Sequence, residues 1–123
     1  KSQDLAQKSG FSRMSFVTST MEEASHIPSL KPNLVCALHA CDTATDDAIL
    51  YGLKSQAHVI AVVPCCQAEV ARLLESTKVD LSLFWDFPIH RREFGSHLTN
   101  VIRCLFLKSQ GYNVTVTELV GWE

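Results

Sequence analysis

Asn33-Leu-Val-Cys-Ala-Leu-His-Ala-Cys-Asp-Thr-Ala-Thr-Asp-Asp47 is the stretch that decides the fold of this chain. Its first part, Leu34 to Leu38, is apolar without polar alternation, which predicts a strand buried on both faces of a parallel sheet. The second part is polar, and Thr43 or Thr45 is expected to cap a helix with an acidic first turn. The polar residues between these parts therefore lie at the carboxyl end of the strand, where open α/β sheets bind ligands: His39, Cys41 and Asp42.

A second apolar run, His58 to Val63, predicts another buried strand, because it is rich in β-branched residues and stops at Pro64. Cys65, Cys66 and Gln67 follow the proline. If the two strands are neighbours in a parallel sheet, their carboxyl ends lie about 5 Å apart. We therefore expect the polar residues that follow the two strands to face one pocket.

The remaining segments alternate between expected helices and expected strands. Helices are expected over 1–9, after Ser19 or Thr20, from Asp46, over 68–76 and over 94–110, and further strands over 14–18 and 112–120. Residues 79–93 lack a clean period and are expected to form a loop or short helix over the sheet edge. This order predicts an α/β fold, a Rossmann-like parallel sheet with helices on both faces. The apolar stripe of the last helix is expected to be core: Leu98, Val101, Ile102, Leu105 and Phe106.

Composition narrows the class of protein. A chain of 123 residues is expected to form at most one domain, over 1–123, and a net charge of −2 does not by itself indicate a nucleic-acid partner. No apolar run approaches the roughly 18 residues that cross a bilayer, and we find no signal segment, so we expect no membrane partner. The cysteines are odd in number and lie in apolar patterns, which favours a reduced, cytoplasmic protein: Cys36, Cys41, Cys65, Cys66 and Cys104.

Two stretches resemble the signatures of a known family. His39-Ala-Cys-Asp-Thr-Ala-Thr-Asp46 and Pro64-Cys-Cys-Gln67 are similar to the segments that follow the fourth and fifth strands in class I S-adenosylmethionine-dependent methyltransferase-like proteins. Residues 94–123 are also similar, with an amphipathic helix, a Gly-Tyr break and a strand that ends in Trp-Glu. The resemblance implies S-adenosyl-L-methionine as the cofactor and a methyl acceptor that is RNA, protein or a small molecule.

The chain also departs from the family pattern. It has neither the glycine-rich turn after the first strand nor the acidic residue that ends the second, and its five glycines are isolated. The resemblance therefore implies an incomplete sheet, with the first two strands and the last strand missing. The open sheet edges are expected to be covered by an oligomer or a partner chain.

The resemblance assigns roles to individual residues. Asp42 would position or deprotonate the methyl acceptor as a catalytic residue, with Cys41 beside it. The cofactor would lie against the loop after the third strand, which reaches the adenine, and against the first signature stretch: Thr20, Met21, His39 and Ala40. The substrate pocket would be lined by both signature stretches and one residue of the loop over 85–94: Thr45, Asp46, Pro64, Cys65, Cys66, Gln67 and Arg91.

The cysteines admit two other interpretations. With His39, the thiols of Cys41, Cys65 and Cys66 are soft ligands for zinc, although their spacing is not the C-x₂₋₄-C of structural zinc sites. Adjacent cysteines of an extended chain point to opposite faces, so only one of Cys65 and Cys66 is expected to reach the pocket. Alternatively, the cysteines are small buried hydrophobes and His39 satisfies backbone groups in a tight turn.

Alternatives stay open elsewhere too. Thr20 and Met21 also fit an N-cap followed by a core methionine. The chain has one cluster of basic and aromatic residues: Trp85, Phe87, His90, Arg91 and Arg92. These residues could bind single-stranded nucleic acid, or they could be solvated charges beside a packed aromatic loop. For the whole chain, the alternatives to a methyltransferase are a non-catalytic Rossmann-like interaction module and a zinc-binding domain.

Overall fold

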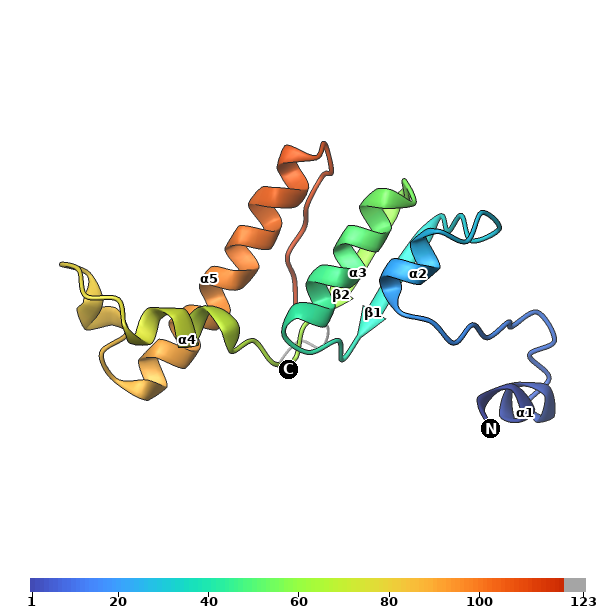
Figure 1. Cartoon of the computed structure of the whole chain (residues 1–123), viewed down its shortest axis with the longest axis horizontal. Coiled ribbons are helices and arrows are strands. Elements are labelled where there is room, and N and C mark those ends of the chain that lie inside the picture. Colours follow the sequence, from blue (N-terminus) through green and yellow to red (C-terminus); the bar gives the residue numbers. More distant parts are fainter. Residues whose placement is uncertain (119–123) are drawn as a thin grey trace.

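Eight elements follow one another along residues 1–118, the part of the chain that the computed structural model describes. They are α1 (Ser2–Lys8), α2 (Met21–Ser25), β1 (Leu34–Leu38), α3 (Thr43–Lys54), β2 (Val59–Val63), α4 (Glu69–Glu75), the 3₁₀ helix η1 (Ser82–Phe84) and α5 (Pro88–Ser109) (Figure 1). Among these helices, none combines the length and the apolar character that a membrane crossing requires.

The two strands pair in parallel, as the two apolar runs predict. Leu34 lies opposite Val59 and Leu38 lies opposite Val63, so β1 and β2 begin together and end together. The mixed α/β character of the prediction is confirmed, with β1, α3 and β2 forming one β-α-β unit. Because the strands are in this register, the two signature stretches leave the same edge of the sheet.

Helix α3 packs against both strands, and this contact forms one part of the small core (Figure 1). Ala48 and Ile49 on α3 are buried, as are Val35 and Ala37 on β1. The approach is close at Gly52, where an added Cβ would lie 2.6 Å from Cδ1 of Ile60. A glycine at this position therefore allows α3 to lie directly on β2.

The expectation that β1 is buried on both faces is wrong for the described residues. Burial alternates along the strand, and Leu34 and Leu38 are 54% and 60% exposed. Helices therefore cover one face of β1 and leave the other open in this part of the chain. An unbroken apolar run shows that both faces are apolar, but it cannot show that a helix lies over each.

Two of the expected strands are absent from residues 1–118. The segment 14–18 is outside any helix or strand, with Phe16 and Val17 exposed, and the segment 112–118 is likewise irregular. Leu119 and Val120, the end of the second expected strand, lie outside the described residues. A strand needs a neighbour that completes its backbone hydrogen bonds, and neither segment pairs with β1 or β2.

Helix starts differ from expectation at two places. α3 begins at Thr43 with Asp42 as its N-cap, so neither Thr43 nor Thr45 caps it as expected. α5 begins at Pro88, six residues before the expected start at Phe94, because proline is well suited to the first helical position. The loop expected over 79–93 is thereby shortened and contains the 3₁₀ turn η1.

The buried face of α5 is not the predicted apolar stripe. Gly95, Arg103 and Leu107 are buried, whereas Val101, Ile102, Leu105 and Phe106 are 40–61% exposed. The buried residues share the i, i+4 spacing of one helix face, and Gly95 lets α5 approach the backbone of Ala71 on α4. The helical period predicted for this segment is confirmed, but the face predicted to be buried is wrong. Periodicity does not show which face of a helix another element covers.

Candidate functional site

The residues that follow β1 and β2, 39–42 and 64–67, form one structural unit that we call the corner. The backbone N–H of Asp42 donates a hydrogen bond of 2.7 Å to the carbonyl of Cys66. This bond ties the loop after β1 to the loop after β2. The prediction that the two signature stretches lie side by side at one edge of the sheet is confirmed.

The first loop of the corner has an unusual backbone. His39 and Asp42 have φ values of 56° and 52°, a region that favours glycine. Each such residue costs on the order of 1–3 kcal/mol, and such residues cluster at functional sites. The surrounding hydrogen bonds hold this conformation, which gives the corner a fixed shape.

The Asp42 side chain connects the corner to α4. Its Oδ1 accepts hydrogen bonds from the backbone N–H groups of Ala68 (3.2 Å) and Glu69 (3.1 Å), and its Oδ2 accepts one of 2.8 Å from Arg72. The Arg72 guanidinium, followed by the two backbone donors, lowers the pKa of Asp42. The carboxylate is thus ionised and caps the N-terminus of α4, whose own N-cap residue, Ala68, has no side-chain acceptor.

Arg103 of α5 connects the same corner to α3. Its guanidinium donates to both carboxylate oxygens of Asp46 (2.7 and 2.9 Å), to the side-chain oxygen of Gln67 (3.2 Å) and to the carbonyl of Asp42 (2.9 Å). The Arg103 side chain is 8% exposed. This planar, bidentate contact is the strong form of a charge-assisted pair.

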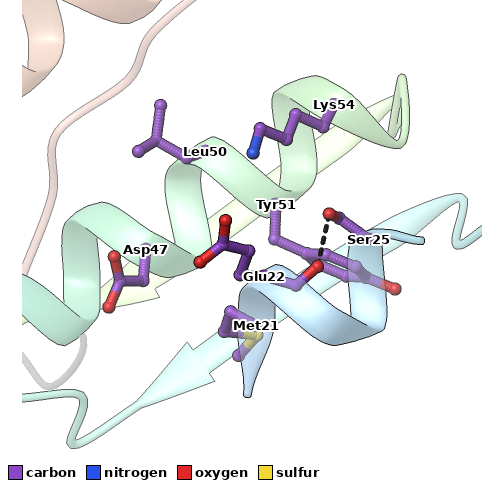
Figure 2. Close-up of a pocket in the computed structure, with 7 residues that line it drawn as sticks. All are labelled: Met21, Glu22, Ser25, Asp47, Leu50, Tyr51 and Lys54. Carbon is purple, nitrogen blue, oxygen red and sulfur yellow. Dashed lines mark hydrogen bonds between the residues drawn. The ribbon is translucent and has the colours of Figure 1, made fainter. Parts of the chain in front are cut away.

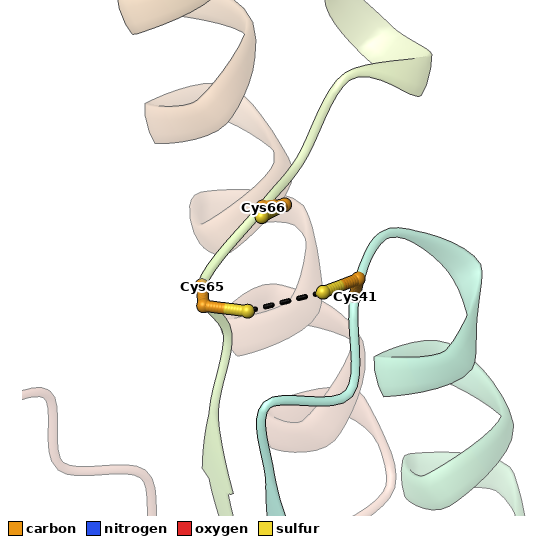
Figure 3. Close-up of side chains that lie close together, drawn as sticks. All are labelled: Cys41, Cys65 and Cys66. Carbon is orange, nitrogen blue, oxygen red and sulfur yellow. Dashed lines mark hydrogen bonds between the residues drawn. The ribbon is translucent and has the colours of Figure 1, made fainter.

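Three thiols gather at the corner (Figure 3). The Sγ atoms of Cys41 and Cys65 are 3.1 Å apart, and those of Cys41, Cys65 and Cys66 all lie within 4.8 Å of one another. Both adjacent cysteines therefore reach the cluster, and the expectation that only one does is wrong. β2 ends at Val63, so Cys65 and Cys66 lie outside the regular strand in which side chains alternate between faces.

The thiols of this cluster differ in acidity. Hydrogen bonds with Cys65 and then Cys66 raise the pKa of Cys41 to about 12. Hydrogen bonds with Cys41 and then His39 lower the pKa of Cys65 to about 7. All three cysteines are exposed, so the interpretation of them as small buried hydrophobes is wrong.

The other predicted pocket residues at the corner have structural partners. The Thr45 hydroxyl, which is fully buried, donates to the carbonyl of Ala40. Asp46 and Gln67 accept hydrogen bonds from Arg103, and Pro64 follows the last residue of β2. The structure thus brings these residues together, but their side chains bind the protein itself.

Thr20 and Met21 lie at the start of α2. Thr20 forms a capping box with Glu23, in which each side chain bonds the backbone N–H of the other, and this lowers the pKa of Glu23. The N-cap interpretation of Thr20 is therefore confirmed. Met21 is 44% exposed rather than core, and it lines a depression of about 230 Å³ between α2 and α3 with Glu22, Ser25, Asp47, Leu50, Tyr51 and Lys54 (Figure 2).

A second depression, of about 210 Å³, lies between α3 and α5 and is lined by Asp46, Ile49, Leu50, Ile102, Arg103 and Phe106. Ligand pockets usually measure roughly 300–1,000 Å³. Neither depression reaches that size, and neither contains a thiol of the corner. We therefore base the site on the corner, where the polar groups converge, and not on either depression.

Arg91 does not join the corner in any described contact. Its guanidinium pairs with Glu75 at 3.0 Å and so links α5 to α4. Nearby, Trp85 is buried and stacks on Phe94 with ring centroids 5.5 Å apart, and its indole N–H donates to the carbonyl of Thr77. Trp85 is thus packed beside charged residues, as the second interpretation proposed, whereas Phe87 of the same cluster is 66% exposed and is not packed.

Arg72 and Arg103 are site residues that sequence reasoning missed. One signal for Arg103 was available, because it shares its helix face with Gly95, Thr99 and Leu107 at a spacing of four residues. An arginine on a buried helix face is expected to have an acidic partner, because arginine is rarely buried unless it is paired. No local signal identifies Arg72, whose partner, Asp42, lies 30 residues earlier.

Comparison with known proteins gives one match. A family model described as a methyltransferase domain matches residues 1–73, more than half of the 123 residues and inclusive of both corner loops. The match does not include residues 94–123, so it does not test the resemblance of that segment to the family. A search of the curated proteins and a search of the solved structures each find no match. On the evidence of the family match, the chain belongs to the methyltransferase domain family.

Proposed function

We propose that this chain takes part in methyl transfer from S-adenosylmethionine, with the cofactor and the methyl acceptor meeting at the corner. The observation that carries the proposal is the family match over 1–73, which includes both loops of the corner. Methyl transfer requires a nucleophile placed in line with a methyl group that the sulfonium already activates. A rigid corner with few free acid–base groups suits such chemistry.

The cofactor side of the proposed site uses Thr20, Met21, His39 and Ala40. Met21 is the exposed apolar group that would cover the adenine, and the depression beside it includes Asp47 of the first two turns of α3. Because α3 starts directly after the corner, a ligand that extends from Met21 across this helix start would reach Ala40. Thr20 would hold this loop in place and not bind the cofactor through its polar groups, since its hydroxyl and its backbone N–H are both used in the capping box.

Asp42 is better suited to positioning than to proton abstraction. Both of its carboxylate oxygens accept hydrogen bonds, and the lowered pKa makes it a weak base. We propose that Asp42 fixes the loop on which the acceptor lies, with Cys41 beside it. Hydrogen bonds to three further residues hold this loop. Thr45 donates to Ala40, and Arg103 donates to Asp46 and Gln67.

Calorimetric titration of the full chain with S-adenosylmethionine, or with its demethylated product, tests the proposal. We expect saturable binding, with adenosine triphosphate as a control that shares the adenine and ribose but has no sulfonium. Absence of binding at millimolar ligand would overturn the proposed function. Met21→Ala should weaken binding, while Met14→Ala, a matched change at the other exposed methionine, should not.

A second candidate function follows from the exposed surface. The chain exposes 9,724 Å², whereas a compact protein of 13.7 kDa exposes about 6,600 Å². Leu34 and Leu38 of β1 and Ile102 and Leu105 of α5 are at least half exposed. Such apolar area favours a Rossmann-like module covered by another chain. Light scattering on the full chain tests self-association: a mass of 13.7 kDa at all concentrations would exclude a second copy as the cover.

A further inference from the structure

We propose that Cys41, Cys65 and Cys66 form a binding site for a zinc ion, with three thiolate ligands and one coordination position open to a small molecule. The three Sγ atoms lie within 4.8 Å of one another. Among the described residues, this is the group of metal-ligating side chains whose ligand atoms lie this close together. The inference does not depend on methyl transfer.

The distances fit a shared zinc ion after small movements. A Zn–S bond is about 2.3 Å, so two ligands of a tetrahedral ion are about 3.8 Å apart. The sulfurs of Cys41 and Cys65 are 3.1 Å apart, and the widest separation in the cluster does not exceed 4.8 Å. Side-chain rotations that move each sulfur by about 1 Å or less give the required geometry.

The backbone around the thiols is already organised for a ligand. The hydrogen bond from the Asp42 N–H to the Cys66 carbonyl joins the two loops that carry the thiols. Cys41 lies between His39 and Asp42, the two residues of this loop with positive φ. The guanidinium groups of Arg72 and Arg103 both bind Asp42, which follows Cys41, and so help to hold the loop that carries this thiol.

The spacing of the cysteines argued against zinc at the sequence level, because neither pair is C-x₂₋₄-C. That rule describes ligands presented by one short loop. Here the ligands come from two loops that the register of β1 and β2 brings together. A site with three protein ligands and an open position is the arrangement of catalytic zinc sites, and binding would release the protons of the three thiols.

Metal analysis of the full chain tests this site. The chain is expressed with added zinc, purified under a phosphine reductant and analysed by mass spectrometry of the metal. We expect about one zinc per chain, and Cys41→Ser, Cys65→Ser or Cys66→Ser should each weaken zinc binding by more than about tenfold. Cys36→Ser and Cys104→Ser are matched controls outside the cluster and should leave it unchanged.

A measurement on the unmodified chain keeps the test independent of variant folding. Zinc should protect the three cluster thiols from alkylation, whereas Cys36 should react equally with and without zinc. A substituted Co²⁺ ion should show sulfur-to-metal charge transfer that Cys41→Ser reduces. Absence of zinc, zinc retained in all three cluster variants, or a Cys41–Cys65 disulfide in place of metal under reductant would overturn the proposal.

Discussion

Arg103 provides the sharpest prediction about stability. We expect Arg103→Met to destabilise the full chain by about 2–3 kcal/mol. The substitution removes four hydrogen bonds, two of them to the Asp46 carboxylate, while it keeps the apolar stem of the side chain. Breaking a buried ion pair costs about 3–5 kcal/mol. The cost expected for Arg103→Met is smaller than this, because the Asp46 side chain is 42% exposed and is hydrated by water when Arg103 is lost.

Urea unfolding followed by circular dichroism measures this change. With a slope of about 1–3 kcal/mol/M for small proteins, the midpoint should fall by about 0.7–3 M. Arg92→Met is the matched control, because Arg92 is on the same helix, is exposed, and its side chain makes no hydrogen bond or ion pair among residues 1–118. Its effect should stay within about 0.5 kcal/mol.

A double-mutant cycle isolates the pair itself. Arg103→Met and Asp46→Asn together should cost less than the sum of the single changes, by about 0.5–3 kcal/mol. Arg103→Lys should lie between the wild type and Arg103→Met, because lysine keeps the charge but cannot form the bidentate contact. Equal midpoints for Arg103→Met and Arg92→Met, or a coupling energy of zero, would refute the role of Arg103 as the link between α5 and the corner.

Three further predictions concern caps and close packing. The lowered pKa of Glu23 means that the capping box is formed at neutral pH and is lost as pH falls through the folded-state pKa. An NMR titration of the Thr20 amide should therefore show a midpoint below 4.5, the ordinary value for glutamate, and a midpoint at or above 4.5 would contradict this. Asp42→Ala should speed hydrogen exchange at the amides of Ala68 and Glu69, which lose their acceptor, while Asp80→Ala should not; unchanged exchange would mean that Asp42 does not cap α4. Gly95→Ala should destabilise by about 1–3 kcal/mol in urea, since the added Cβ would lie 2.7 Å from a backbone atom of Ala71. In contrast, Gly52→Ala meets only the Ile60 side chain, and the clash should be relieved by Ile60→Ala, which removes both close carbons; a neutral Gly95→Ala would show that α4 and α5 are not in such close contact.

The parts of the fold that the sequence predicted are those set by local chemistry. Leu34 to Leu38 and the β-branched run before Pro64 are apolar, short and bounded by strand-breaking residues, and both form strands. Once two consecutive strands are parallel neighbours, the corner follows from geometry alone. Thr20 and Glu23 are three residues apart, which is the spacing that a capping box requires.

The parts that could not be predicted depend on contacts across long stretches of sequence. Asp42 interacts with α4 rather than with its own helix, and Arg103 reaches Asp46 across 57 residues. An apolar stripe on α5 carries no information about which face meets α4. Residues 14–18 include apolar side chains that would suit a strand. No neighbouring strand pairs with this segment among residues 1–118.

Hydrogen exchange of the full chain, with and without S-adenosylhomocysteine, tests most directly whether the corner is the cofactor site. We expect slower exchange in segments 19–21, 39–42 and 64–67, with little change over α5. Unchanged exchange at both corner loops, or protection confined to α4 and α5, would contradict it.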